Sequence, residues 1–335
     1  FQLASWVRTM FEDEVAVVKI EKGQSASDEL INELCLLLKS GSEEVRTSAL
    51  DKLKDLEDER AVPVLLDVFM DSLEPEKQDL IATLLSCGSA KTGKQLTELY
   101  GDETSPRVKA SLIKTIGKLG SRKVIGFMEQ ALAEDDTRVR ANAIEALEEI
   151  GGDEAFAIIL GAVEDSDNRV KANAIRAIYR LKGLFLDEAL REMLQHHDSS
   201  MKKSAAFAAG EMCVPEVIND LEELLRDPDE EVRAHAVRAL GKIRGVESLE
   251  ILLAALVYYY QSGDEKLLTA VRESIIYHPA QDVLPDILME ALSNKSEFPS
   301  ECVDEVLLEF LKKEKQRGQT WFSLRWKRWF NKLFH

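Results

Sequence analysis

The chain has 335 residues, of which 45% are hydrophobic, and its 61 acidic and 43 basic residues give a net charge of −18. Such an excess of acid disfavours nucleic acid as a partner for most of the surface, because phosphate groups would be repelled. The sequence contains no run of about 18 apolar residues, so no part of it is expected to span a bilayer.

Residues 1–26 are predicted to form an N-terminal capping helix, or a linker that continues from a removed upstream segment. The chain begins at Phe1 without a methionine, and a signal or transmembrane segment before it is one of the alternatives. Five apolar residues are spaced as on one face of a short helix: Leu3, Trp6, Val7, Met10 and Phe11.

Residues 27–279 contain seven copies of one pattern, at steps of 31 or 32 residues, from Val45-Arg46 to Val232-Arg233. In each copy the fifth position is small or leucine and the ninth is apolar, and this spacing keeps both on one helical face. We name this helix the inner helix of the repeat. A small fifth residue should allow the inner helix of the neighbouring repeat to approach closely.

Polar and glycine residues mark the two ends of these inner helices. Three residues before the first position of a copy, which is Val45 in the first copy, a side-chain oxygen can accept hydrogen bonds from the free amides of the first helical turn. Six residues supply that cap: Ser42, Ser105, Asp136, Asp167, Asp198 and Asp229. Glycine follows the last turn, where a left-handed residue closes a helix, at Gly88, Gly120, Gly151 and Gly245.

A second apolar run lies between successive inner helices and predicts an outer helix in each repeat. Examples are residues 64–69, 125–132, 156–163, 186–193 and 217–225. Two helices per repeat with short turns form an antiparallel hairpin that stacks on the next. The predicted fold is therefore all-α, an α-α superhelix or solenoid of about eight helical hairpins.

The C-terminal part of the chain departs from the repeat. Residues 249–260 and 265–277 are predicted to form a distorted eighth hairpin, and residues 280–316 are predicted to form C-terminal capping helices. Residues 317–335 are predicted to form a basic, aromatic, amphipathic tail helix. Residues 311–335 hold eight basic residues and one acid, so the rest of the chain carries −25.

The four cysteines, Cys35, Cys87, Cys213 and Cys302, lie far apart without paired spacing. Three of them occupy apolar positions of predicted helices, which indicates buried thiols in a reducing compartment. We therefore expect a cytoplasmic protein, which could also be peripheral at the inner face of the membrane.

The most regular polar feature is a basic residue at the second position of every repeat, which we call the ladder. In a solenoid these side chains align along one surface: Arg46, Lys77, Lys109, Arg140, Lys171, Lys202 and Arg233. They are either structural ion-pair partners or a stripe that binds an anion or a protein. Of these, Arg140, Lys171, Lys202 and Arg233 are our candidates for partner binding.

Two positions after the ladder stand Asn142, Asn173, Ser204 and His235, again 31 residues apart. Asn142, Asn173 and His235 are candidates to face a concave groove and bind a ligand peptide, with solvated helix positions as the alternative. His196-His197-Asp198 includes metal-ligand types, but Asp198 is needed as a cap and no third ligand is near in sequence. We predict no metal site, no cofactor and no catalytic residue.

The tail, residues 320–335, places aromatic residues on one helical face and most cations off it. Such a helix is typical of contact with an anionic membrane surface. Folding back as a cap on the acidic solenoid and insertion into a partner's groove are the alternatives. Eight residues are the candidates for membrane or partner contact: Phe322, Arg325, Trp326, Arg328, Trp329, Phe330, Lys332 and Leu333.

The segments DDTRVRANAIEALEEIGG, DSDNRVKANAIRAIYRLKG and DPDEEVRAHAVRALGKIRG resemble the HEAT-like repeat of the phycobilisome-lyase type. The resemblance covers residues 27–245 closely and residues 246–315 more loosely. It implies that the ladder pairs with acids of adjacent turns, here Asp135, Asp136, Asp165, Asp167, Asp198 and Asp229.

The resemblance is specific for fold and unspecific for function, because such repeats occur in scaffolds, adaptors and a few enzymes. We expect a non-enzymatic scaffold that binds a protein partner. One alternative is a bilin lyase or isomerase-type subunit that acts on a phycobiliprotein. Another is nucleic-acid binding of the kind found in HEAT-like DNA glycosylases, which the acidic body disfavours.

Overall fold

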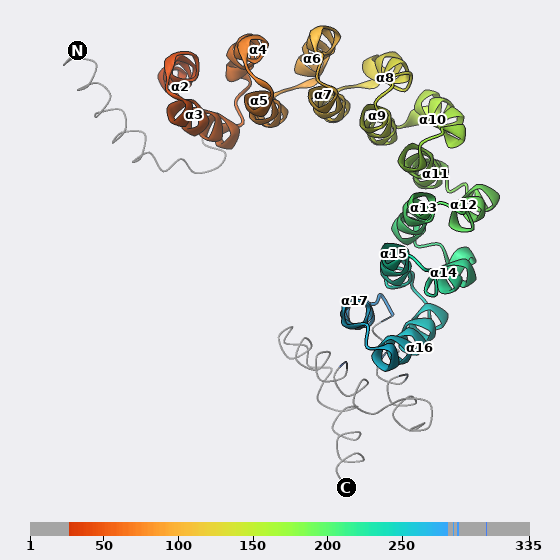
Figure 1. The fold of residues 1–335 in the computed structure, drawn as a ribbon. Coiled ribbons are helices and arrows are strands. Elements are labelled where there is room, and N and C mark those ends of the chain that lie inside the picture. Colours follow the sequence, from red (N-terminus) through yellow and green to blue (C-terminus); the bar gives the residue numbers. More distant parts are fainter. Residues whose placement is uncertain (1–26, 281–283, 285–286, 288–305, 307–335) are drawn as a thin grey trace, which may run out of the picture. The chain divides into compact units, whose positions relative to one another are not determined.

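The computed structural model describes residues 27–280 together with residues 284, 287 and 306, and all regular elements among them are helices (Figure 1). The chain divides into two compact units, one ending at Ala162 and the other beginning at Val163. The predicted N-terminal helix, most of the predicted capping region 280–316 and the whole tail 317–335 lie outside the described residues.

The first unit is a stack of helical hairpins. Its outer helices are α2 (Asp28–Ser40), α4 (Val62–Asp71), α6 (Ala90–Asp102), α8 (Ile125–Ala131) and α10 (Gly152–Gly161). Its inner helices are α3 (Glu43–Leu56), α5 (Glu74–Cys87), α7 (Pro106–Leu119) and α9 (Thr137–Ile150). The inner helices pack on one another in chain order from α3 to α9, and each packs on its own outer helix.

The second unit repeats this arrangement. Its inner helices are α11 (Asn168–Lys182), α13 (Ser199–Met212), α15 (Glu230–Leu240) and α17 (Glu265–Ile276). Its outer helices are α12 (Asp187–Leu194), α14 (Ile218–Leu224) and α16 (Val246–Ser262). Inner helices again pack on one another in chain order. Both units therefore confirm the predicted all-α stack of hairpins.

The predicted N-caps precede the inner helices as expected. Ser105 accepts from the amide of Val108, and Asp229 accepts from those of Glu231 and Val232. Ser42 occupies the cap position of α3, but its side chain makes no capping hydrogen bond. Local sequence thus fixes where most of these helices begin.

The prediction of left-handed glycines at the helix ends was wrong for two of the four. Gly88 and Gly120 follow their helices with φ of −86° and −73°, which any residue can adopt. Glycine is needed there for space, since a Cβ would lie 2.5 Å from the carbonyl oxygen of Leu84 or 2.4 Å from that of Ile116. Gly151 and Gly245 do have positive φ.

Small residues set the distance between neighbouring inner helices. A Cβ added to Gly117 on α7 would lie 2.3 Å from the Cβ of Ala146 on α9. In the second unit, a Cβ on Gly210 of α13 would lie 2.9 Å from the Cα of Ala239 on α15. The fifth-position alanines are buried as well. Close helix approach therefore depends on side chains that the repeat pattern specifies.

Two of the three described cysteines, Cys35 and Cys87, are buried free thiols. Burial raises the pKa of the Cys87 thiol to about 11, which keeps it protonated and unreactive at neutral pH. Cys213 is exposed rather than buried. It ends α13 in a left-handed conformation, with φ of 54°, so its side chain leaves the apolar face. Cys302 lies outside the described residues.

Candidate protein-binding surface

Ladder side chains pair with carboxylates in the turn that precedes the next inner helix. In the second unit, Nζ of Lys202 lies 2.6 Å from Oδ2 of Asp227, and the two side chains are 19% and 4% exposed. In the first unit, Nζ of Lys109 lies 3.0 Å from Oε1 of Glu134. The Lys109 ammonium holds the pKa of Glu134 below its usual range. These ladder residues stabilise the stack.

Earlier repeats use the same device with slightly different spacing. Lys77 pairs with Glu103 at 2.7 Å, and Glu103 is only 5% exposed. Arg46 pairs with Glu76 at 2.8 Å, but Glu76 lies in the first turn of α5 rather than in the turn before it. Arg140 donates to the backbone carbonyls of Glu134 and Asp135, both at 2.9 Å.

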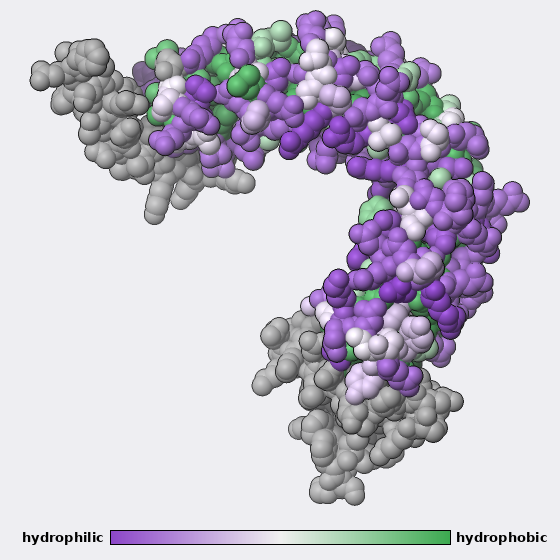
Figure 2. All heavy atoms as spheres, viewed as in Figure 1, coloured by the Kyte–Doolittle hydropathy of each residue, from purple (hydrophilic) through white to green (hydrophobic). Residues whose placement is uncertain are grey.

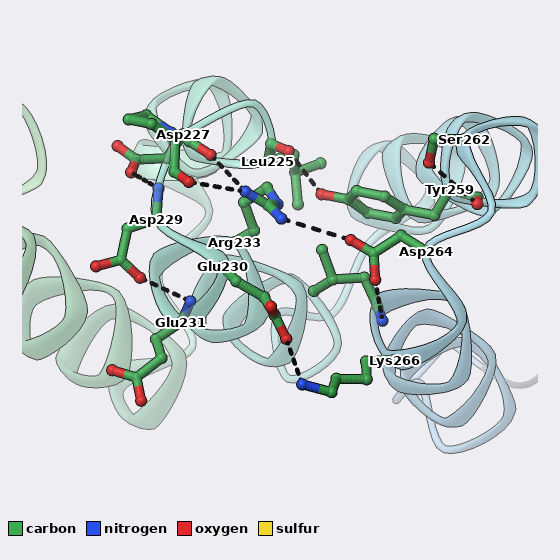
Figure 3. A network of polar contacts seen from close by, with 12 residues as sticks. Leu225, Asp227, Asp229, Glu230, Glu231, Arg233, Tyr259, Ser262, Asp264 and Lys266 are labelled. Carbon is green, nitrogen blue, oxygen red and sulfur yellow. Dashed lines mark hydrogen bonds and ion pairs between the residues drawn. The ribbon is translucent and has the colours of Figure 1, made fainter.

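Arg233 joins three segments of the second unit (Figure 3). Its Nη1 donates to the carbonyl oxygens of Asp227 and Pro228, at 2.9 and 3.2 Å, and its Nη2 lies 3.4 Å from Oδ2 of Asp264. Asp264 also caps α17 by accepting from the amide of Leu267. Arg233 therefore ties the inner helix α15 to the turns on both sides of it.

The acids in these pairs are largely not those that the resemblance implied. Asp136, Asp198 and Asp229 are occupied as helix caps, and Asp136 also binds Arg138 of its own turn at 2.8 Å. The partners are instead residues such as Glu134 and Asp227, which lie 25 residues after their ladder base. A carboxylate just before the turn reaches the lysine of the previous repeat, whereas the cap carboxylate points back at its own helix.

The carboxylate that pairs with a ladder lysine, which we call the turn acid, also accepts a backbone hydrogen bond within its own turn. Asp227 accepts the lysine with Oδ2 and the amide of Asp229 with Oδ1, the latter at 2.9 Å. At the equivalent position, 25 residues after Lys171, the chain has His196. Its Nδ1 accepts the amide of Asp198 at 3.1 Å, so the turn is kept.

The ion pair, however, is lost at this repeat. Within the part of the chain that the structure describes, no carboxylate pairs with Lys171. His196 and His197 stack with ring centroids 4.2 Å apart. Among the described residues, no group of three metal-ligating side chains is brought together.

The second candidate row behaves differently at each repeat. Asn142 is partly buried, and its Nδ2 donates to the carbonyl of Ala110 on the neighbouring inner helix at 2.7 Å. Asn173 is 5% exposed. His235 is partly exposed, and its Nδ1 lies 2.8 Å from the carbonyl of Glu231. Asn142 and Asn173 are therefore framework residues, and His235 is the accessible one of the three candidates.

Sequence reasoning missed a cluster on the inner helices α11, α13 and α15. Glu211 binds Lys242 at 2.5 Å and Arg180 at 3.3 Å. Lys242 also lies over the ring of Phe207, 5.5 Å from its centroid. Phe207 is 46% exposed despite its size. This cluster could have been found by comparing, across the repeats, the residues that stand five and nine places after each ladder residue. After Lys202 these are Phe207 and Glu211.

The described residues include a small surface pocket. A pocket between α14 and α16 is lined by Leu225, Ile251, Tyr258 and Tyr259 among others, and its volume is about 60 Å³. Ligand pockets are usually about 300–1,000 Å³. The visible surface is mostly hydrophilic (Figure 2), and no described helix is long and apolar enough to cross a bilayer.

Residues 93–179 and 187–259 match the sequence family described as HEAT repeats. These two stretches are therefore HEAT repeats, as the repeat pattern predicted. No curated protein sequence matches it.

Several solved structures are similar to the chain. An engineered protein is 21% identical, with a TM-score of 0.36, over 84% of this chain and 88% of that one. The complex of CpcE and CpcF of phycocyanin lyase from Nostoc is 16% identical, with a TM-score of 0.43, over 76% and 98%. Kap121p is 16% identical, with a TM-score of 0.41, over 87% of this chain but 38% of its own. Similarity at this level carries no argument about function.

Proposed function

We propose that the chain is a non-enzymatic scaffold or adaptor that binds a protein partner along the exposed surface of its inner helices. One observation supports this most. The stacked inner helices expose polar and charged side chains at regular intervals along the chain, while their apolar side chains are buried between the helices. A rigid, regularly spaced surface suits extended contact with another macromolecule.

Under this proposal, some ladder residues stabilise the stack of helices and others contact the partner. Lys202 and Arg233 are held by the turn contacts described above, so they position the helices. Lys171 and His235 are the ladder and second-row residues that we propose for partner contact. Mutating Lys171 should weaken partner binding more than it changes thermal stability.

Crosslinking in native cells tests the proposal. A lysine-reactive crosslinker followed by purification and mass spectrometry should join a protein partner to lysines of the inner-helix layer such as Lys203 and Lys242. Lys91 and Lys94 on the outer helix α6 serve as internal controls and should give few crosslinks. Crosslinks spread equally over both layers, or none above a mock purification, would reject the binding surface.

Peripheral membrane contact through residues 317–335 belongs to the same proposal. Aromatic and basic residues of the tail would insert at an anionic leaflet, at the cytoplasmic face of the membrane. Flotation with anionic liposomes should be lost when residues 318–335 are deleted. If flotation is unchanged while the melting temperature falls, the tail is instead a cap on the solenoid.

Two other activities can be tested cheaply. Incubation with a bilin and a phycobiliprotein, followed by visible absorbance, would reveal a lyase or isomerase-type activity. A gel shift at low salt would reveal nucleic-acid binding. The scaffold proposal expects neither signal.

A further inference from the structure

Three consecutive inner helices of the second unit carry exposed cations on the same face as one exposed aromatic residue. Phe207 lies on α13, and Arg238, 31 residues later, takes the equivalent exposed position on α15. One turn further along, Arg180, Glu211 and Lys242 occupy equivalent positions on α11, α13 and after α15. We call Arg180, Phe207, Glu211, Arg238 and Lys242 the α11–α15 face.

The contacts within this face are known. Arg180 and Lys242 both reach Glu211, from opposite sides of α13, and their side chains are still 45% and 46% exposed. Phe207 and Lys242 form a cation–π contact. Below them, Arg176 is 8% exposed and adds a further positive charge. Arg180 and Lys242 are therefore accessible to a ligand while they also bind Glu211.

This concentration of positive charge runs against the composition of the chain. The face carries three exposed cations and one acid, whereas the chain as a whole carries −18. The equivalent positions in the first unit carry acids on α3 (Asp51 and Asp55), no charge on α5 (Ala82 and Ser86), lysines on α7 (Lys114 and Lys118) and acids on α9 (Glu145 and Glu149). On the α11–α15 face the cations outnumber the single acid and surround an exposed aromatic residue.

We propose that the α11–α15 face binds an acidic, extended segment of a protein partner, with an apolar side chain of that segment seated on Phe207. This rests on the scaffold function proposed above and names its partner chemistry. Arginine binds carboxylates through paired hydrogen bonds, and an exposed aromatic ring framed by charge is typical of an interface anchor.

The shared carboxylate gives the ligand a pattern. Arg180 and Lys242 both contact Glu211, at 3.3 and 2.5 Å, so their charged groups lie on either side of one carboxylate. Two acids on the same side of an extended segment are two residues apart, which is about 6.6 Å. The expected motif has two aspartates or glutamates at alternate positions and an aromatic or aliphatic residue close to them for Phe207.

A peptide selection tests this inference. A random dodecapeptide library is selected on the full chain, and enriched peptides are measured by fluorescence anisotropy. Enriched peptides should be acidic, with two acids at alternate positions and an apolar residue close to them. Binding should weaken about tenfold for the double substitution R180Q/K242Q, and similarly for F207A.

Two matched variants sharpen the result. The pair K114Q/K118Q changes lysines at equivalent exposed positions on α7 and should leave affinity unchanged. The substitution E211Q removes the acid from the face and should tighten binding by about twofold to threefold, an effect opposite to that of general destabilisation. Melting temperatures identify variants that are merely misfolded.

The outcomes separate this inference from the scaffold function. If no acidic peptide is enriched, or if affinity is insensitive to R180Q/K242Q, the inference is overturned, while native crosslinks to inner-helix lysines would keep the scaffold. A single-stranded oligonucleotide is the second probe. If it binds as tightly as the peptides and is released by R180Q/K242Q, the ligand is nucleic acid and the inference also fails.

Discussion

Substitution of His196 by aspartate should stabilise the second unit. The turn before α13 has a histidine where the turn before α15 has Asp227, and both accept the same backbone hydrogen bond with one atom. Only Asp227 has a second oxygen for a ladder lysine. The change H196D should let Lys171 form the ion pair that Lys202 already makes.

The size of the effect follows from the existing pair. Exposed ion pairs contribute about 0.2–1 kcal/mol, and hydrogen bonds to charged groups about 1.5–3 kcal/mol. The Lys202 pair is mostly buried, but His196 is only partly buried, so we expect a gain of about 1 kcal/mol from the pair. A negative charge near the start of α13 adds roughly 0.3–1 kcal/mol.

Urea denaturation followed by circular dichroism measures this gain. H196N is the control, because its oxygen keeps the turn hydrogen bond without the charge. A double-mutant cycle with K171M separates ion pairing from the helix-dipole effect, and the coupling should be about 1 kcal/mol and should shrink with added salt. Equal stabilities for H196D and H196N, or no coupling to K171M, would refute the assignment of the turn acid as the ladder partner.

Three further predictions concern packing, pH and a buried hydroxyl. Gly117→Val should destabilise the first unit by about 1–3 kcal/mol because it overfills the contact with α9, whereas Gly126→Ala, which faces open space, should not; thermal melts distinguish them. Because Lys109 lowers the pKa of Glu134, the stability from this pair is present above the ordinary pKa of 4.5 and is lost as pH falls below it; a pH series of melts on wild type and E134Q should converge in acid. Tyr259→Phe should cost about 1–3 kcal/mol in urea unfolding, since a buried carbonyl 2.6 Å from its hydroxyl loses its partner.

The repeat pattern predicted the helices well because each cap, apolar stripe and small residue acts locally. Asp229 caps α15 through amides two and three residues away, so its role is readable from sequence. Partners of the ladder were harder to predict. Lys202 could reach several acids, and only the path of the turn decides that Asp227 is the one it binds.

The exposed face was missed for a related reason. A phenylalanine is usually expected in the core. Phe207 stands at the position in its repeat that Arg238 occupies in the next one, and this position is exposed on the surface of the inner helices. Gly88 was predicted to be left-handed by its position after a helix. It is retained instead because a carbonyl oxygen occupies the space of a side chain, a constraint that depends on the path of the backbone.

Affinity purification of the full chain from native cells tests the central claim most directly, when wild type, R180Q/K242Q and K114Q/K118Q are compared side by side. The account predicts one protein partner that wild type and K114Q/K118Q retain equally and that R180Q/K242Q loses. Recovery of the same proteins with all three chains, or of none beyond an empty-resin control, would contradict a scaffold that binds through the inner helices of its second unit.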